Sequence, residues 1–338
     1  MVILKSEFWD DRAFVHPIFE KLLTKNLPKK SGYKQDLYRK LACNLLDKYF
    51  FIFVSKLKVN EFYECGAHDA SASINFKKMA NGKSIAIEAN PYTFESKTSL
   101  ASYHGVVTLN LALGAKNTKS LMFIDLANIT SPATSLLSNK SNYKKIQIPM
   151  STLSNIVKKH SNSKSILALW IDVEGSTFNL LAGAAKIFNT KDCRIIKIEM
   201  ETEKLWSNQK TFSNLDTFLR KYNFVLVCRD IQRSNQFNAV YVKYDYMNSI
   251  KNEIDCYWDD FLNLKLGYRD YLYLIYGRLH ELKLLILKLN YVSIFVHVFF
   301  FLLGSKSSRE YLKKIVQEIA LGVHHKNSSD HVENWSQG

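Results

Sequence analysis

The sequence predicts an α/β fold: a doubly wound, mostly parallel sheet with a helical extension at each end of the chain. Two observations indicate this fold. From residue 60 onward, short apolar runs alternate with longer segments of mixed polarity, as strands alternate with crossover helices around a parallel sheet. Near residue 243 the alternation closes with two β-rich runs on either side of a polar loop, as expected of an antiparallel hairpin at a sheet edge.

Five apolar runs have the length of strands and are predicted to form the parallel part of the sheet. They are residues 62–65, 84–88, 105–112, 165–173 and 194–200. The segments between them have helical length and spacing. Four helices are therefore predicted, at residues 72–80, 94–103, 152–160 and 176–188. The closing hairpin is predicted from residues 224–229 and 239–244.

The rest of the chain predicts helical extensions. Residues 1–59 are predicted to be mainly helical, and the apolar and aromatic side chains of residues 37–54 are available to cover one side of the sheet. Residues 247–338 have long-helix periodicity without proline and end in a polar tail. We expect an N-terminal extension, a core domain over residues 60–246, and a C-terminal extension.

The composition limits the class of protein. The chain has 338 residues, of which 47% are apolar, and a formal charge of +15. This apolar content is sufficient for a buried core, so a globular protein is expected. The charge points to an anionic partner, and membrane lipid, acidic glycan and nucleic acid all qualify, although a solvated lysine-rich surface explains it equally well. Much of the excess lies in residues 21–40 and 306–314, outside the predicted core.

The cysteines and the N-terminus indicate a reducing compartment. The five cysteines are scattered and form no CxxC pair, and the adjacent His324 and His325 lack a metal-ligand spacing, so no structural metal is expected. The first apolar stretch is interrupted by Lys5, Glu7 and Asp10 and does not resemble a secretory signal. We therefore expect a cytoplasmic protein.

The first predicted strand runs into a turn of small residues, Cys65 to Ser71. Gly66 has no Cβ and Ala67 has only a methyl group, so the amides at the start of the next helix can approach a cofactor closely. Glu64 and Asp69 can accept hydrogen bonds from the amino and hydroxyl groups of that cofactor. Two acids suit a positively charged sulfonium cofactor, whereas a dinucleotide site would carry the later glycines of GxGxxG.

Glu88 ends the second predicted strand, 22 residues after Gly66. An acid at this spacing can bind ribose hydroxyls, and this role is favoured over that of an exposed helix cap. The following Asn90-Pro91-Tyr92 is similar to the motif with which nucleic-acid amino-methyltransferases grip a flipped base. In those enzymes the motif follows the fourth strand, so a turn after Glu88 is the interpretation preferred here.

The fourth predicted strand ends in Asp172 and Glu174, at the sheet edge where ligands bind in open α/β sheets. Strand alternation places both carboxylates on one side, where either could orient an acceptor hydroxyl, take its proton or ligate a cation. Asp172 is the candidate for acceptor or cofactor positioning, and Glu174 is equally well explained as a cap for the following helix. Glu199, at the end of the fifth strand, lines the same cleft or is a buried structural acid.

Two histidines are further candidates, because histidine titrates near neutral pH. His68 lies in the cofactor turn and could contact cofactor or acceptor as a base, and His104 lies just before the third strand. A structural role is the alternative for both histidines.

Taken in order, five strings resemble the FkbM family of methyltransferases. They are FYECGAHDASAS, IAIEANP, LNLALGAKN, SPATSLLS and LWIDVEGSTFNLLAGA, and FNAVYVK resembles the closing strand of that family. The resemblance covers about residues 60–243 and leaves both extensions unexplained.

The resemblance implies a Rossmann-like fold, S-adenosylmethionine as methyl donor, and O-methylation of a hydroxyl on a sugar, glycan or related metabolite. It implies cofactor contacts for Glu64, Gly66 and Asp69 in the first motif and for Glu88 and Asn90 in the ribose-side motif. Asp172, Glu174 and Gly175 match the family signature near the methyl group. Ala70 departs from the family, which commonly has glycine there, and this tightens the turn.

Residues 284–303 form an apolar stretch with Lys288, Asn290, Ser293 and His297 inside it. The part after Lys288 is too short to span a bilayer, which needs about 20 residues. Two interpretations remain for this part of the chain. Residues 284–314 contact an anionic membrane peripherally, or the apolar stretch is buried in a core or homodimer. Alternative functions are a non-catalytic membrane- or glycan-binding module and a nucleic-acid methyltransferase, and nucleic acid is the less favoured partner.

Overall fold

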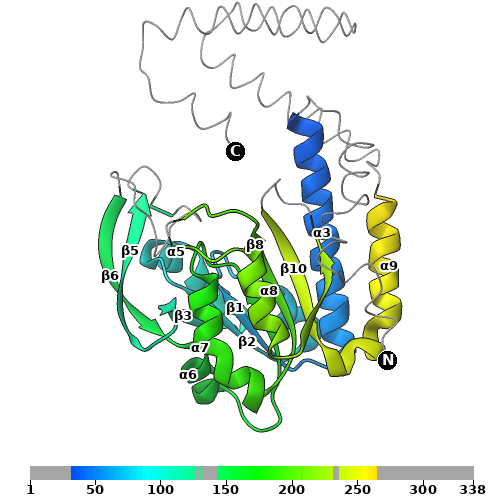
Figure 1. Ribbon diagram of the computed structural model, residues 1–338. Helices are drawn as coiled ribbons and strands as arrows, with labels where there is room; N and C mark the ends of the chain where they lie inside the picture. Colours follow the sequence, from blue (N-terminus) through cyan, green and yellow to red (C-terminus); the bar gives the residue numbers. More distant parts are fainter. Residues whose placement is uncertain (1–31, 126–128, 131–142, 207, 231–235, 265–338) are drawn as a thin grey trace, which may run out of the picture. The chain divides into compact units, whose positions relative to one another are not determined.

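The structure is a computed structural model, and it describes residues 32–125, 129–130, 143–206, 208–230 and 236–264. Its centre is a seven-stranded sheet with the order β3-β2-β1-β7-β8-β10-β9 (Figure 1). The strands are β1 Glu61–Cys65, β2 Lys83–Glu88, β3 Val107–Asn110, β7 Ile166–Ile171, β8 Asp192–Glu201, β9 Phe224–Arg229 and β10 Gln236–Lys243. Neighbouring strands pair in parallel except β10, which is antiparallel to both β8 and β9. The predicted Rossmann-like fold class is confirmed.

The strand order reverses between β1 and β7. From β1 the chain builds outward through β2 to β3, and from β7 it builds in the other direction through β8. In open α/β sheets such a switch point leaves a crevice at the carboxyl ends of the two central strands, where ligands bind. The residues that follow β1 and β7 are therefore expected to line the ligand site.

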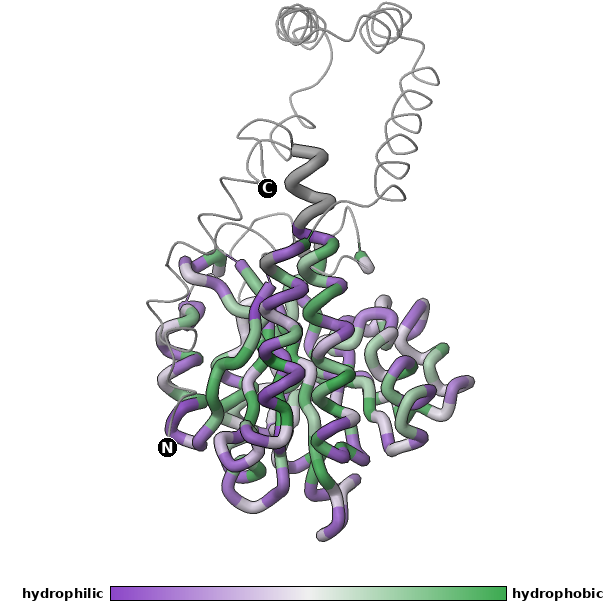
Figure 2. The backbone as a smooth tube through the Cα atoms, turned by 90° about the vertical axis from the view of Figure 1, so that its right-hand side faces the viewer, coloured by the Kyte–Doolittle hydropathy of each residue, from purple (hydrophilic) through white to green (hydrophobic). Residues whose placement is uncertain are grey.

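Helices cover both faces of the sheet (Figure 1). On one face, Phe62 of β1 packs against Phe50 of α3 (Gly32–Lys56) and stacks on Phe76 of α4 (Ser71–Ala80). On the other face lie α6 (Leu153–His160), α7 (Thr177–Thr190) and α8 (Phe212–Arg220). Hydrophobic and hydrophilic residues alternate along the covering helices (Figure 2), as expected of helices that bury one side.

Two helices outside the predicted core domain belong to the same hydrophobic cluster as the sheet. The first is α3, and the second is α9 (Lys251–Leu262), which follows the 3-10 turn η3 (Tyr244–Ile250). The Tyr49 hydroxyl of α3 donates to Asp260 of α9 at 2.7 Å, and the Trp258 indole of α9 donates to the carbonyl of Val227 in β9 at 3.1 Å. The side chains predicted to cover one side of the sheet therefore do so.

A second, three-stranded sheet was absent from the sequence prediction. Its order is β4-β6-β5, with β4 Ala112–Leu113, β5 Thr118–Asp125 and β6 Tyr143–Ser151. Along β5, Met122 and Ile124 are buried whereas Leu121 is 52% exposed, so this sheet has one solvated face. The third predicted strand, residues 105–112, is shorter than expected, because Gly105 caps the preceding turn and Ala112 belongs to this second sheet.

The remaining differences from the predicted elements are local. The helix predicted over residues 94–103 is two pieces, α5 (Pro91–Ser96) and the 3-10 turn η2 (Thr98–His104), because Lys97 leaves the helical region with φ −135°. The helix α8 was not predicted. Residues 1–31, the apolar stretch 284–303 and the polar tail lie outside the described residues. Within the described ranges, none of the helices has the length and apolarity to cross a bilayer.

Candidate active site

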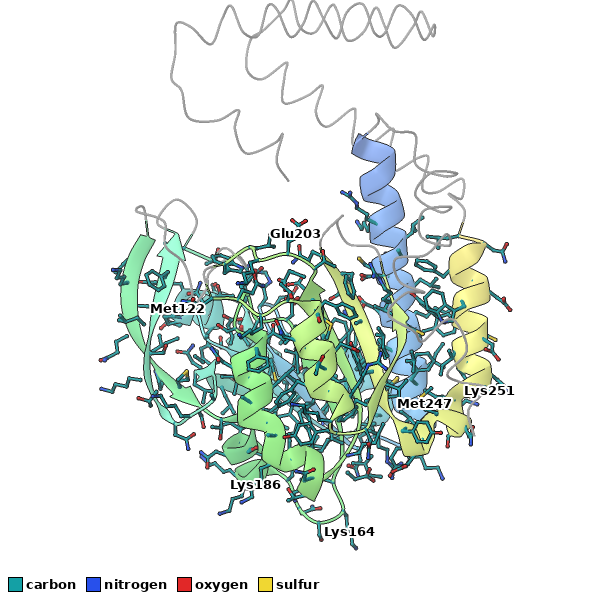
Figure 3. All side chains as sticks on the ribbon, in the orientation of Figure 1. Met122, Lys164, Lys186, Glu203, Met247 and Lys251 are labelled. Atoms are coloured by element: carbon teal, nitrogen blue, oxygen red, sulfur yellow. The ribbon has the colours of Figure 1, made fainter. Side chains whose placement is uncertain are left out.

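Backbone hydrogen bonds join the carboxyl ends of three neighbouring strands. The amides of Gly66 and Ala67, after β1, donate to the carbonyl of Ile87 in β2 at 2.9 and 3.0 Å. On the other side, the amide of Asp172, after β7, donates to the carbonyl of Cys65 at 2.9 Å. The turn after β1 thus lies between the ends of β2 and β7. Figure 3 shows this edge: Glu203, after β8, lies on it, and Lys164, before β7, lies on the opposite edge.

The turn from Gly66 to Ala70 has an unusual backbone. Gly66 has φ +82°, and the non-glycine residues His68 and Ala70 are also left-handed, with φ of 47° and 57°. Such conformations cost about 1 to 2 kcal/mol per residue, and they concentrate at functional sites. Ala67 is 2% exposed, and Asp69 is exposed and accepts from the Ser71 amide at 3.0 Å at the start of α4. The cofactor roles expected of Ala67 and Asp69 remain predictions.

Glu64 points to the start of α4. Its carboxyl is 4% exposed and accepts from the amide of Ser73 at 2.7 Å. Burial raises the pKa of Glu64 to about 7, although the hydrogen bonds from Ser73 and Ala72 oppose the rise. The carboxyl therefore stabilises the first turn of the helix that follows the glycine turn, and its direct contact with a cofactor remains a prediction.

Glu88 connects two turns. One carboxylate oxygen accepts from the His68 amide at 2.9 Å, and the other accepts from the Asn90 amide at 2.8 Å. Burial raises the pKa of Glu88, and these hydrogen bonds oppose the rise. Each carboxylate oxygen has a second lone pair, so Glu88 can hold the turn and still accept a hydrogen bond from a ligand hydroxyl.

Asn90 begins α5. Its side-chain oxygen accepts from the Tyr92 amide at 3.0 Å, and its nitrogen donates to the carbonyl of Ile129 at 2.8 Å. This is the arrangement of a helix N-cap followed by proline at the first helical position. The turn interpretation of Asn90-Pro91-Tyr92 agrees with this geometry, and the cofactor contact of Asn90 remains a prediction.

Asp172 follows β7 at the carboxyl edge of the sheet. Its side chain is solvent-exposed, yet desolvation by the surrounding protein raises the pKa of its carboxyl. The carboxyl can be both exposed and partly desolvated, because protein atoms surround it while solvent still reaches it. The charge of Lys197 and a side-chain hydrogen bond with Glu199 favour the ionised form. Burial also raises the pKa of Glu201, and the charge of Asp172 adds to that rise, so these three acids face one another.

The histidines are placed differently. The Nε2 atom of His68 lies 2.9 Å from the ammonium of Lys97, and because an ammonium only donates, this nitrogen is an acceptor. His68 lies near Asp172, so a base role stays a prediction, and Nε2 would have to exchange its contact with Lys97 for the acceptor proton. His104 precedes the amino end of β3, at the opposite sheet edge, so the structure does not bring it to this site.

Sequence reasoning missed Trp206. The side-chain oxygen of Gln209 accepts from the amides of Leu205 and Trp206 at 2.7 and 3.1 Å and folds the loop after β8. The indole packs on Gly175, where an added Cβ would lie 2.8 Å from the ring and φ is +68°. Among the described residues, the Trp206 Nε1 and the hydroxyl of Ser176 are buried without a hydrogen-bond partner. Polar atoms beside Glu174 and Gly175 are thus available to a ligand, and nothing local in the sequence indicates this.

Lys197 was also missed, although a lysine inside the apolar run Ile195 to Ile198 is a signal. It is 4% exposed and pairs with Asp47 of α3 at 2.8 Å. In the part of the chain that the structure describes, no group of three or more histidine, cysteine or acidic side chains is arranged to hold a metal ion.

One family model and several solved structures are similar to this chain. Residues 64–226 match the Methyltransferase FkbM domain, and a search of curated protein sequences gives no match. Magnesium protoporphyrin IX methyltransferase from Synechocystis PCC 6803, with bound SAM, aligns over 71% of this chain and 95% of its own, with 9% identity and a TM-score of 0.35. An O-methyltransferase from Bacillus cereus, in complex with SAH, aligns over 66% and 96%, with 11% identity and a TM-score of 0.36.

The strand order alone carries the fold class, independently of these two structures. The domain match is independent of them and includes the turn after β1, Glu88 and the Asp172-to-Gly175 segment. It confirms the expected family and, with it, S-adenosylmethionine as the methyl donor. Residues 64–226 form a methyltransferase domain of the FkbM family.

Proposed function

We propose that this protein transfers the methyl group of S-adenosylmethionine to a hydroxyl of a sugar, glycan or related metabolite. The observation that carries the proposal is the placement of Glu88 and Asp172 on either side of the Gly66 turn, at the ends of β2 and β7. When bound, the cofactor supplies an electrophilic methyl group on a positively charged sulfur.

The residues of the edge fit such a cofactor. Gly66 keeps a Cβ out of the crevice, where it would lie 1.8 Å from the carbonyl oxygen of Asp172. Glu88 has lone pairs for ribose hydroxyls, whereas the first amides of α4 already donate to Asp69 and Glu64. Carboxylates near the sulfur favour its positive charge. Thr93 of α5, near Glu88 in sequence, is a further candidate, because within the described chain its buried hydroxyl has no hydrogen-bond partner.

Asp172 would receive the acceptor. The transfer is an in-line displacement, so the protein chiefly has to align the acceptor oxygen behind the methyl carbon, which contributes on the order of 7 to 11 kcal/mol in favourable systems. A carboxylate with a raised pKa is a better proton acceptor at neutral pH, and general-base catalysis adds about 10² to 10⁴ in rate. Asp172 would take the proton from the hydroxyl, and the neighbouring Glu174 and Ser176 would help to orient it.

The proposal is tested in two steps. Isothermal titration calorimetry with S-adenosylhomocysteine should show one site on the wild-type protein, strongly weakened affinity for Glu88→Ala, and no change for Glu95→Ala, an exposed acid on α5. A mass-spectrometric screen of glycans and glycosides should then find a product heavier by one methylene group. Binding of S-adenosylhomocysteine without any methylated hydroxyl product would contradict O-methylation and favour a non-catalytic or nucleic-acid-directed protein.

A further inference from the structure

A buried lysine lies beneath the acids of the acceptor side. Lys197 on β8 is 4% exposed, and its ammonium lies 2.8 Å from Asp47 Oδ1 and 3.4 Å from the centroid of the Trp170 ring. Removing an ammonium from water costs several kcal/mol unless it is paired. Asp47 and the indole face supply that compensation, so the cation is held at a defined place.

The register of the sheet relates Lys197 to Asp172. Trp170 on β7 pairs with Lys197 on β8, and both strands are parallel. Because side chains alternate along strands, Asp172 and Glu199, two residues further on, face the same side as Trp170 and Lys197. The amide of Asp172 still bonds to β1, so the extended backbone continues to that residue. Lys197 therefore lies on the same face of the sheet as the Asp172–Glu199 pair, two residues before it along the strand direction.

Other titratable groups face this place from the surrounding elements. Asp47 and Cys43 come from α3, Asp230 follows β9, Glu199 and Glu201 belong to β8, and His68 comes from the turn after β1. Most of these groups are acids. For both Asp172 and Asp230, Lys197 is the charge that most favours the ionised carboxylate against the effect of burial.

The anchor of Lys197 lies outside the methyltransferase domain match, which begins at residue 64. Asp47 is on α3, whose Phe50 packs edge-on against Trp170 at a centroid distance of 5.4 Å. The helix thus supplies both the counter-charge and the apolar cover for the lysine.

We propose that Lys197, anchored by Asp47 of α3, is a positioning residue that keeps the carboxylate of Asp172 charged, so that α3 contributes to the active site. The inference rests on the proposed function in one respect, namely that Asp172 receives the acceptor. It adds a residue pair that neither the family signature nor the acid pattern of the sequence contains.

The test is a titration of Asp172 in the full-length protein. Aspartate labelled with ¹³C at the side-chain carboxyl is followed by NMR, and the Asp172 signal is identified by its loss in Asp172→Asn. In Lys197→Met the midpoint pH of the Asp172 titration should rise by about one pH unit or more, because a nearby opposite charge has an effect of this size. Lys197→Arg should return it toward the wild-type value. Lys243→Met removes a lysine on β10 that caps the ring of Phe224 and should leave the midpoint unchanged.

Two controls keep the result interpretable. If Lys197→Met alone does not fold, the double variant Asp47→Asn, Lys197→Met removes both charges of the ion pair, so Asp47 is not left without its cation. A smaller rise is then expected, because the charge of Asp47 itself raises the pKa of Asp172. Calorimetry with S-adenosylhomocysteine on the same samples separates the two proposals. If the wild-type protein does not bind S-adenosylhomocysteine, the proposed methyltransferase function fails, whereas the effect of Lys197 on Asp172 is still measured by the titration. An Asp172 midpoint that stays at the wild-type value in a folded variant without Lys197 would overturn the inference.

Discussion

The carbonyl oxygen of Asp172 lies so close to Gly66 that a Cβ added to the glycine would be 1.8 Å from it. Two strands separated by more than 100 residues in the chain therefore meet at their carboxyl ends with no room for a side chain. The same contact places the acceptor-side carboxyl beside the turn that the cofactor would approach. The glycine is required here for space as well as for its φ of +82°.

Gly66→Ala should strongly destabilise the protein and abolish binding of S-adenosylhomocysteine, because the backbone of Asp172 has to move. Gly105→Ala is a matched control, since Gly105 also has a positive φ of +74°, but its added Cβ would meet only the flexible end of Lys77. That variant should lose about 1 to 2 kcal/mol of unfolding free energy and keep the binding. Chemical denaturation and calorimetry check both variants. Equal losses in the two variants would argue against the close approach.

Glu88→Gln keeps the shape of the side chain but removes its charge and one of its two acceptors. One of the amides of His68 and Asn90 then loses its partner, and a ligand hydroxyl loses a charged acceptor. Hydrogen bonds to charged groups are worth about 1.5 to 3 kcal/mol, so the affinity for S-adenosylhomocysteine should fall by about 10- to 150-fold. Calorimetry measures this, and an unchanged affinity would remove Glu88 from the site.

The stability of the protein should depend on pH through Glu64. Its pKa in the folded state, about 7, is above its ordinary value of 4.5, so the unfolded state loses the proton first as pH rises. Ionisation therefore favours unfolding, and stability falls between about pH 4.5 and 7, by at most about 3 kcal/mol from this group. Glu64→Gln should abolish this part of the pH dependence in urea denaturation. A wild-type and variant pair with parallel stability profiles would contradict the burial of this carboxyl.

The helix α3 should be required for the stability of the whole fold. Phe50 is fully buried against Phe62 and Trp170, and its truncation to alanine should lower the free energy of unfolding by about 3 to 5 kcal/mol. Leu100→Ala, at a position that is 53% exposed, should change it by less than about 0.5 kcal/mol. Guanidinium denaturation of both variants measures the two changes in the free energy of unfolding. A small effect of Phe50→Ala would mean that α3 is dispensable.

The central strands were predictable because a parallel sheet buried on both faces produces short, continuous apolar runs. The predicted run 62–65 falls within β1, and the run 84–88 falls within β2. The second sheet was not predictable in this way, because Thr118–Asp125 and Tyr143–Ser151 carry lysines on a solvated face and Pro149 interrupts the second of them. Its apolar alternation is visible only once the partner strand is known.

The sequence indicated which acids lie at the edge but not where they point. Glu88 and Asp172 were expected at the ends of β2 and β7 because carboxyl ends of parallel strands share one edge. The sequence could not show that Glu64 accepts from the Ser73 amide. Its position at the end of the first strand is compatible both with this contact and with a direct contact to the cofactor. The Lys197–Asp47 pair joins residues 150 positions apart, and such a contact depends on tertiary packing.

We propose that the carboxyl ends of β1, β2 and β7 form the cofactor site. A crystal structure of the full-length protein with S-adenosylhomocysteine tests it most directly. We expect ligand density against Gly66, with the ribose hydroxyls hydrogen-bonded to Glu88 and the sulfur on the side of Asp172. Density for the ligand anywhere else, or a crevice closed by side-chain packing, would contradict it.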